Sequence, residues 1–377
     1  MGHCASAHVG RFDMVEKPPG FGVFGCSLDA LDASEKVAMK LAYMDAVACG
    51  RIESGCARDP YDLLVGELTA GSNSVAVGKV MLESWVTPRP DPADAGMVSA
   101  AGYSEFLGSG GCAAVCEGLT EFVKEKVLPL RPLLVGVDHS LTGGVCEALA
   151  GEHGPDRLAL IVLDSHFDAV PASVRRSAGA HQAGEGKGHG AATGGGRAEM
   201  SGLPESYTCG NWLADVLERG VLLPENVAVI GPSDHPGYAG EPGGEVGFSV
   251  YRRSYLSFED RGVRVVPKRT LRHRGIQAAV ASGLEGLEGK EVYLSIDADV
   301  AAGERVKAVR YLDTIGLTGA ELEELFGALG DWLAGSGSAL AGMDLMEIDV
   351  HLADIPGSTD RTAATFLELL KRFVERF

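Results

Sequence analysis

Short runs of apolar residues alternate with longer amphipathic stretches along most of the chain. The runs are rich in Val, Ile and Leu, a pattern typical of parallel strands that are buried on both faces. We predict strands at residues 133–137, 158–163, 227–230, 263–266, 292–296 and 345–350. Apolar positions at helical spacing predict helices at residues 35–47, 209–219, 276–287, 319–334 and 360–377. This alternation predicts an α/β fold, a three-layer α/β/α sandwich around a mostly parallel central sheet.

Two segments depart from this pattern. Residues 1–130 give few clear elements apart from the helix at 35–47. Residues 172–206 contain nine of the 52 glycines in the chain, which predicts a flexible, polar insertion. His181 and His189 lie in this insertion, and we expect them to be solvated loop residues because a Gly-rich chain does not hold a ligand in place.

The composition narrows the class of protein. The chain has 377 residues, with 33 Lys and Arg against 52 Asp and Glu, which gives a formal net charge of −19. So acidic a chain lacks the basic surface that binding to nucleic acid or to an anionic membrane requires. The apolar share of 45% is that of a globular protein. No apolar run is long enough to span a membrane and the first residues lack the apolar core of a signal peptide, so we expect a cytoplasmic protein.

The eight cysteines carry little information about chemistry. Only Cys112 and Cys116 are close in sequence, and a single Cys-x3-Cys is a weak metal signal. In a chain of this length we expect most cysteines to be small buried apolar residues in a reducing compartment.

Metal-binding side chains follow three of the predicted strands, at the point where each strand ends. The candidate ligands are His139, Asp164, His166, Asp168, Asp297 and Asp299. Alternate residues of an extended segment face the same way, so Asp164 and His166 share one side, as do Asp297 and Asp299. Because ligands of an open α/β sheet bind outside the carboxyl ends of the strands, we expect these side chains to surround one crevice.

Four carboxylates and two imidazoles packed together repel one another unless cations lie between them. Two divalent ions would neutralise four carboxylate charges, and mixed oxygen and imidazole donors suit Mn²⁺, Fe²⁺ or Zn²⁺ better than Ca²⁺. Two such ions lower the pKa of a shared water and supply hydroxide at neutral pH. Taken alone, an Asp-x-Asp is usually a solvated turn and an Asp-x-His-x-Asp can be a structural network. Their common position after apolar strands favours a metal site.

At these residues the chain resembles the ureohydrolases, the family of arginase, agmatinase, guanidinobutyrase and formimidoylglutamase. The family motifs Gly-Gly-Asp-His-Ser, Asp-Ala-His-x-Asp and Ser-x-Asp-x-Asp are similar to residues 136–140, 164–168 and 295–299. The family's Glu-Val-Asn-Pro resembles residues 347–350, and its Gly-Leu-Thr-x-x-Glu resembles residues 316–321. The resemblance extends from about residue 133 to the C-terminus and implies a single arginase-like domain over residues 1–377.

The resemblance implies two Mn²⁺ ions per subunit at the edge of the sheet. By position, His139 and Asp168 would belong to one ion, His166 and Asp299 to the other, and Asp164 and Asp297 would bridge both. Glu347 would hold the cationic amidine of the substrate, and Asp138 would orient His139 or protonate the departing amine. The implied reaction is hydrolysis of a C–N bond in a small linear amidine or guanidine, with no nucleic-acid or membrane partner. Family members are often trimers or hexamers, so we expect a homo-oligomer.

Departures from the family pattern bear on the substrate. Arginases follow the second motif with an Asn that helps to bind the amino-acid end of arginine, whereas Val170 and Pro171 stand in that region here. The later His-Gly turn of arginases and agmatinases is matched by a stretch with Cys209 and no His, and formimidoylglutamases lack that His too. Ala302 and Gly303 replace the Asp-Pro that usually continues the third motif.

We therefore expect agmatine, converted to putrescine and urea, as the first substrate, with formimidoylglutamate or guanidino acids as alternatives. A further alternative is a catalytically silent metal-binding homologue with a regulatory role. Deacetylases of related fold use one zinc ion and do not explain six retained ligands.

Overall fold

The computed structural model describes residues 20–52, 56–169, 207–233, 235, 253, 255–301, 303, 305–312, 316–353 and 358–377. The predicted insertion at residues 172–206, with His181 and His189, lies outside the described residues, as do Val170, Pro171 and Ala302. That residues 1–377 form a single domain stays a prediction.

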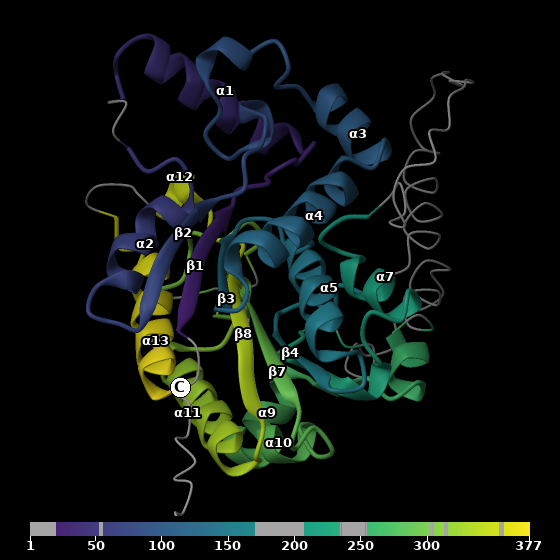
Figure 1. The fold of residues 1–377 in the computed structure, drawn as a ribbon. Coiled ribbons are helices and arrows are strands. Elements are labelled where there is room, and N and C mark those ends of the chain that lie inside the picture. Colours follow the sequence, from purple (N-terminus) through teal and green to yellow (C-terminus); the bar gives the residue numbers. More distant parts are fainter. Residues whose placement is uncertain are drawn as a thin grey trace, which may run out of the picture.

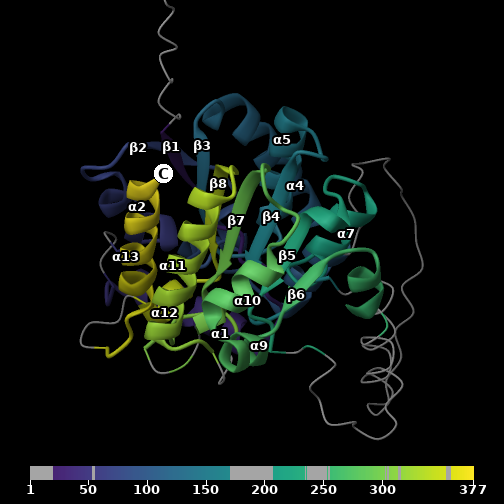
Figure 2. The same cartoon turned by 90° about the horizontal axis from the view of Figure 1, so that it is seen from below.

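A parallel sheet of eight strands crosses the described part of the molecule in the order β2-β1-β3-β8-β7-β4-β5-β6 (Figures 1 and 2). The strands are β1 (Phe21–Cys26), β2 (Ser74–Lys79), β3 (Arg131–Gly136), β4 (Leu158–Leu163), β5 (Val227–Ile230), β6 (Arg264–Val266), β7 (Glu291–Asp297) and β8 (Ala339–Met346). β3, β4 and β5 are buried along their whole length, as their continuous apolar runs predict. The predicted fold class is confirmed.

Helices cover both faces of this sheet and give the predicted three layers. They are α1 (Ser34–Ala48), α2 (Pro60–Thr69), α3 (Ala100–Gly108), α4 (Gly111–Phe122), α5 (Leu141–His153), α7 (Trp212–Glu218), α9 (Lys268–Arg274), α10 (Ile276–Gly283), α11 (Gly319–Gly335), α12 (Val350–Ala353) and α13 (Thr362–Arg376). Shorter helical turns lie at Ser84–Val86, Pro92–Asp94, Val123–Val127, Pro224–Asn226 and Ala298–Ala301. Among the described residues, every helix is too short or too polar to cross a lipid bilayer.

Two apolar cores hold the layers together, one on each face of the sheet. The first joins the sheet to α2, α10, α11 and α13, and the second joins it to α1, α4, α5 and α7. Successive residues of β7 divide between them, with Leu294 in the first core and Tyr293 in the second. Figures 1 and 2 show α11 and α13 across the sheet from α5 and α7.

The N-terminal part contains elements that the sequence pattern did not predict, including β1, β2 and α2 to α4. β1 contains Gly22 and Gly25, which weaken its strand signal. Gly25 is required by packing, because a Cβ atom there would lie 2.7 Å from Tyr61 Cβ in α2. The close approach of α2 to β1 thus explains a residue that made the strand hard to recognise.

The last strand was predicted too late in the chain. β8 spans Ala339–Met346, whereas the prediction was 345–350. Glu347 has a φ of 64°, which turns the chain out of the sheet, and Val350 begins α12. Glu347 consequently lies just beyond the carboxyl end of β8 instead of inside a strand.

Candidate metal centre

The candidate ligands meet at the carboxyl ends of four adjacent central strands, β3, β8, β7 and β4. His139 follows β3, and Glu347 follows β8. Asp297 is the last residue of β7, and Asp299 lies in the turn after it. The sheet order therefore brings residues that are far apart in sequence to one edge, as the strand ends predicted.

His139 is the centre of a first group of carboxylates. Its Nδ1 atom lies 3.1 Å from Asp164 Oδ2, 3.2 Å from Asp168 Oδ2 and 3.1 Å from Asp297 Oδ2. The imidazole is fully buried, and so is Asp164. One nitrogen and three carboxylate oxygens thus converge on a single small volume.

His166 is the centre of a second group next to the first. Its Nδ1 atom lies 2.9 Å from Asp299 Oδ2 and 3.6 Å from Asp164 Oδ1. Asp164 therefore contributes one oxygen to each group. Ligand atoms of Asp297, Asp299 and Glu347 also lie within 4.8 Å of one another. Two adjoining sets of metal-type donors, joined through shared carboxylates, occupy this edge of the sheet.

Several of the atoms that could bind a metal ion are buried without a hydrogen-bond partner among the described residues. They are His139 Nδ1, Asp164 Oδ2 and Asp299 Oδ2. A buried polar atom without a partner costs free energy, so such atoms are rare unless water or an ion completes the site. The donor set of imidazole nitrogen and carboxylate oxygen therefore fits divalent transition metal ions.

The His139 ring is oriented by a layer of side chains inside the sheet. His139 Nε2 lies 2.9 Å from Ser295 Oγ, and Ser295 donates to Asp344 Oδ1 at 2.8 Å. Asp344 also accepts from Thr142 Oγ1 and from the Ile296 backbone N–H. These contacts fix the ring so that Nδ1 faces the carboxylates, the arrangement that metal-binding histidines need. Sequence reasoning did not identify this layer.

Asp138, Cys209 and the cysteine pair were also named from the sequence. Asp138 accepts hydrogen bonds from Ser140 N, Ser140 Oγ and Arg310 Nη1. Cys209 lies in the loop before α7, and burial together with the negative charge of Asp138 raises the pKa of its thiol well above the usual value. Cys112 and Cys116 are buried in the apolar core, and no candidate metal group in the described part of the chain contains a cysteine.

The electrostatics of the cluster favour a bound cation. Burial raises the pKa of Asp164 and of Asp297, and neighbouring carboxylates raise both further. Burial alone would lower the pKa of His139 and of His166, but the surrounding carboxylates raise it well above the usual value. The ionised forms of these buried carboxyl groups are thus costly where water cannot screen them, and positive charge nearby stabilises them.

Backbone strain is concentrated at the same place. Asp168 and Glu347, with φ of 50° and 64°, are the non-glycine residues with positive φ in the described part of the chain. Such conformations are costly and persist where the surrounding structure enforces them, often at functional sites. His166 is 43% exposed, and the ring of Tyr311 lies 6.4 Å from it between centroids. The His166 side of the cluster therefore opens toward solvent.

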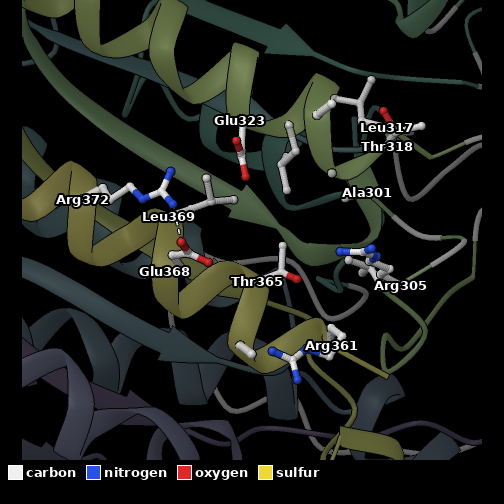
Figure 3. Close-up of a pocket in the computed structure, with 15 residues that line it drawn as sticks. Ala301, Arg305, Leu317, Thr318, Glu323, Arg361, Thr365, Glu368, Leu369 and Arg372 are labelled. Atoms are coloured by element: carbon white, nitrogen blue, oxygen red, sulfur yellow. Dashed lines mark hydrogen bonds and ion pairs between the residues drawn. The ribbon is translucent and has the colours of Figure 1, made fainter. Parts of the chain in front are cut away.

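A separate groove lies between α11 and α13 (Figure 3). Its cavity has a volume of about 520 Å³ and is lined by residues that include Arg305, Arg361, Arg372, Glu323 and Glu368. Arg372 and Glu368 pair with each other. None of the candidate metal ligands lines this groove, so the groove is separate from the candidate metal centre.

Comparisons with known proteins agree with this arrangement. The sequence model of the arginase family matches residues 92–370. A comparison with curated proteins found no match. Similar solved structures include proclavaminate amidino hydrolase from Streptomyces clavuligerus, with 20% identity, a TM-score of 0.55 and coverage of 96% of this chain and 95% of that one. Arginase from Bacillus subtilis has 18% identity, a TM-score of 0.56 and coverage of 94% and 98%.

Formimidoylglutamase from Bacillus subtilis is similar as well, with 13% identity, a TM-score of 0.54 and coverage of 95% of this chain and 86% of that one. At these identities the structural likeness concerns the fold, whereas the family model spans most of the chain. The chain belongs to the arginase family, and it is a hydrolase of guanidino or amidino C–N bonds.

Proposed function

We propose that the protein hydrolyses a linear amidine or guanidine at a binuclear manganese centre formed by His139, Asp164, His166, Asp168, Asp297 and Asp299. The observation that carries this proposal is the pair of adjoining donor groups that share Asp164. His139 and Asp168 would hold one ion, His166 and Asp299 the other, and Asp164 and Asp297 both. When bound, the two ions would supply a hydroxide at neutral pH.

The side chains around this centre have separate tasks in the proposed reaction. Glu347, buried beside Asp297 and Asp299, accepts N–H groups of the substrate amidinium and holds its carbon in front of the centre. Asp138, next to His139, takes up the proton that the attacking water loses and passes it to the departing amine, so that its carboxylate is regenerated. Ser295 and Asp344 hold the His139 ring in one orientation. The products are an amine and either urea or an amide.

Agmatine is the first candidate substrate, because the region after Asp168 lacks the Asn that arginases use for the amino-acid end of arginine. Formimidoylglutamate and guanidino acids follow. Retention of all six candidate ligands and of Glu347 argues against a silent homologue. A cytoplasmic location and assembly into a trimer or hexamer remain predictions.

Metal analysis tests the centre directly. After loading with Mn²⁺ and removal of excess ions, the protein should contain about two ions per chain, as expected when two cations balance four carboxylates. Elemental analysis of the dialysed protein gives this ratio. A ratio of one or less would contradict the binuclear proposal.

A substrate panel tests the reaction. The Mn²⁺-loaded protein should release urea from agmatine, and the same assay with arginine, 4-guanidinobutyrate and formimidoylglutamate, followed through urea or ammonia, ranks the alternatives. The measured quantity is kcat/KM for each compound. Silence of a fully metallated protein across the panel would favour the non-catalytic alternative.

A further inference from the structure

A buried arginine, Arg310, lies against Glu347, the residue proposed to bind the substrate. Arg310 Nη1 is 3.4 Å from Glu347 Oε1 and donates to Asp138 Oδ2 at 3.0 Å. The Arg310 side chain is 2% exposed. It belongs to the segment between Asp299 and α11, whose sequence departs from the family motif. One guanidinium thus joins the two acids to which the proposed reaction assigns substrate binding and proton transfer.

The backbone holds Arg310 in this position. Arg310 N donates to the Glu347 carbonyl oxygen at 3.0 Å, and Glu347 N donates to the Val137 carbonyl oxygen at 3.1 Å. Val309 and Ile348 form an antiparallel bridge. The segments that carry Arg310, Glu347 and Asp138 are therefore hydrogen-bonded to one another, and the contact between the three side chains follows from the fold.

Arg310 also contacts a third acid, Asp29, which has a second cationic partner. Arg310 Nε lies 3.2 Å from Asp29 Oδ1, but Asp29 also pairs with Lys40 of α1, whose Nζ is 3.1 Å from Asp29 Oδ2. Burial alone would raise the pKa of Asp29, but Lys40 and Arg310 lower it to about 2. Since Lys40 can balance Asp29, the charge of Arg310 is left to be shared between Asp138 and Glu347.

The formal charges of the three side chains that meet at Glu347 then sum to −1. In their ionised forms, Asp138 and Glu347 contribute two negative charges, and Arg310 contributes one positive charge. A single amidinium restores neutrality. Without Arg310, the two buried carboxylates would have no cation between them, and neither side chain would be held in place.

We propose that Arg310 is a positioning residue for the substrate: it holds Glu347 and Asp138 beside the centre, where Glu347 meets the amidinium. This inference rests on the proposed function, in which Glu347 binds the amidine. Arg310 acts through Glu347 and does not itself touch the reacting carbon. The planar guanidinium meets Asp138 and Glu347 through Nη1 and faces Asp29 through Nε, and a lysine ammonium, a single point of charge, spans three acids poorly.

Binding of acetamidinium, measured by calorimetry on Mn²⁺-loaded protein, tests this role together with KM and kcat. Arg310→Lys should weaken acetamidinium binding about tenfold and raise KM by a similar factor, and it should lower kcat because Asp138 is held less firmly, while the manganese content changes little. In a Glu347→Gln background, the same substitution should change the dissociation constant less than about twofold, because the group through which it acts is gone.

Equal effects of Arg310→Lys in both backgrounds would overturn the inference, as would unchanged binding in the single variant. Arg310→Gln serves in the same comparison if the lysine variant does not fold. Arg89→Lys is the matched control, since Arg89 is a buried arginine that donates to the carbonyl oxygens of Ala57 and Val350. The protein could also bind acetamidinium in a way that depends on Arg310 and yet turn over no substrate. That result would contradict the proposed function and still support the positioning role of Arg310.

Discussion

Replacing Asp297 by Asn should remove both metal binding and hydrolysis. Asp297 Oδ2 lies 3.1 Å from His139 Nδ1, and its ligand atoms also lie near those of Asp299 and Glu347. The residue is 2% exposed, so water cannot replace the lost charge. Asn keeps the volume of the side chain but removes one of the four negative charges that balance the ions.

We expect the Mn²⁺ content of Asp297→Asn to fall from about two ions per chain to one or fewer. The value of kcat/KM should fall by at least about a thousandfold, because the ions account for several kcal/mol of transition-state stabilisation. Elemental analysis and the urea assay measure the two effects. Asp331→Asn is the control, since Asp331 is an exposed residue of α11. An Asp297→Asn protein that holds two ions and remains active would contradict the bridging role.

Replacing Glu347 by Gln should impair substrate binding and leave the ions in place. An ionised acceptor that meets an amidinium forms a charge-assisted hydrogen bond, and Gln offers a neutral oxygen and a competing N–H donor instead. We expect kcat/KM to fall about a hundredfold, since a hydrogen bond to a charged group contributes up to about 3 kcal/mol.

The manganese content of Glu347→Gln distinguishes two roles for this carboxylate. Glu347 lies close enough to Asp297 and Asp299 to serve as a metal ligand itself. A content that stays near two ions, together with slow turnover, supports the substrate role. Loss of an ion would assign Glu347 to the metal instead, and a rate within about threefold of the parent would remove it from both roles. Glu323→Gln, at the groove of Figure 3, is the matched control.

The meeting of the six candidate ligands at one edge of the sheet could be predicted because two simple regularities coincide at them. Apolar runs such as that of β4 mark buried strands, and the edge of the sheet gathers the residues after each run, so the sequence alone places Asp164 and His166 together. Glu347 was assigned to the right region but to the wrong position in its strand. Its positive φ is imposed by contacts with other segments, and nothing in its local sequence signals it.

The side chains that support the candidate ligands and Glu347 could not be predicted. Ser295 and Asp344 are polar residues within apolar strands, and their pairing depends on β7 lying next to β8, which has no local signature. Arg310 and Asp29 lie in distant parts of the sequence and meet only through tertiary packing. Contacts of this kind are set by the whole fold, so periodicity and motif spacing do not reveal them.

The place of β8 in the sheet ties the site to a late step of synthesis. β8 is the last of the eight strands to leave the ribosome, yet it lies between β3 and β7. Until it inserts, the strand that leads to His139 has no neighbour connecting it to the strand that ends at Asp297. All six candidate ligands are therefore present in a growing chain before they can be brought together, since long-range strand pairing must come first. Ion binding should accordingly begin only after β8 has been synthesised and has paired with β3 and β7.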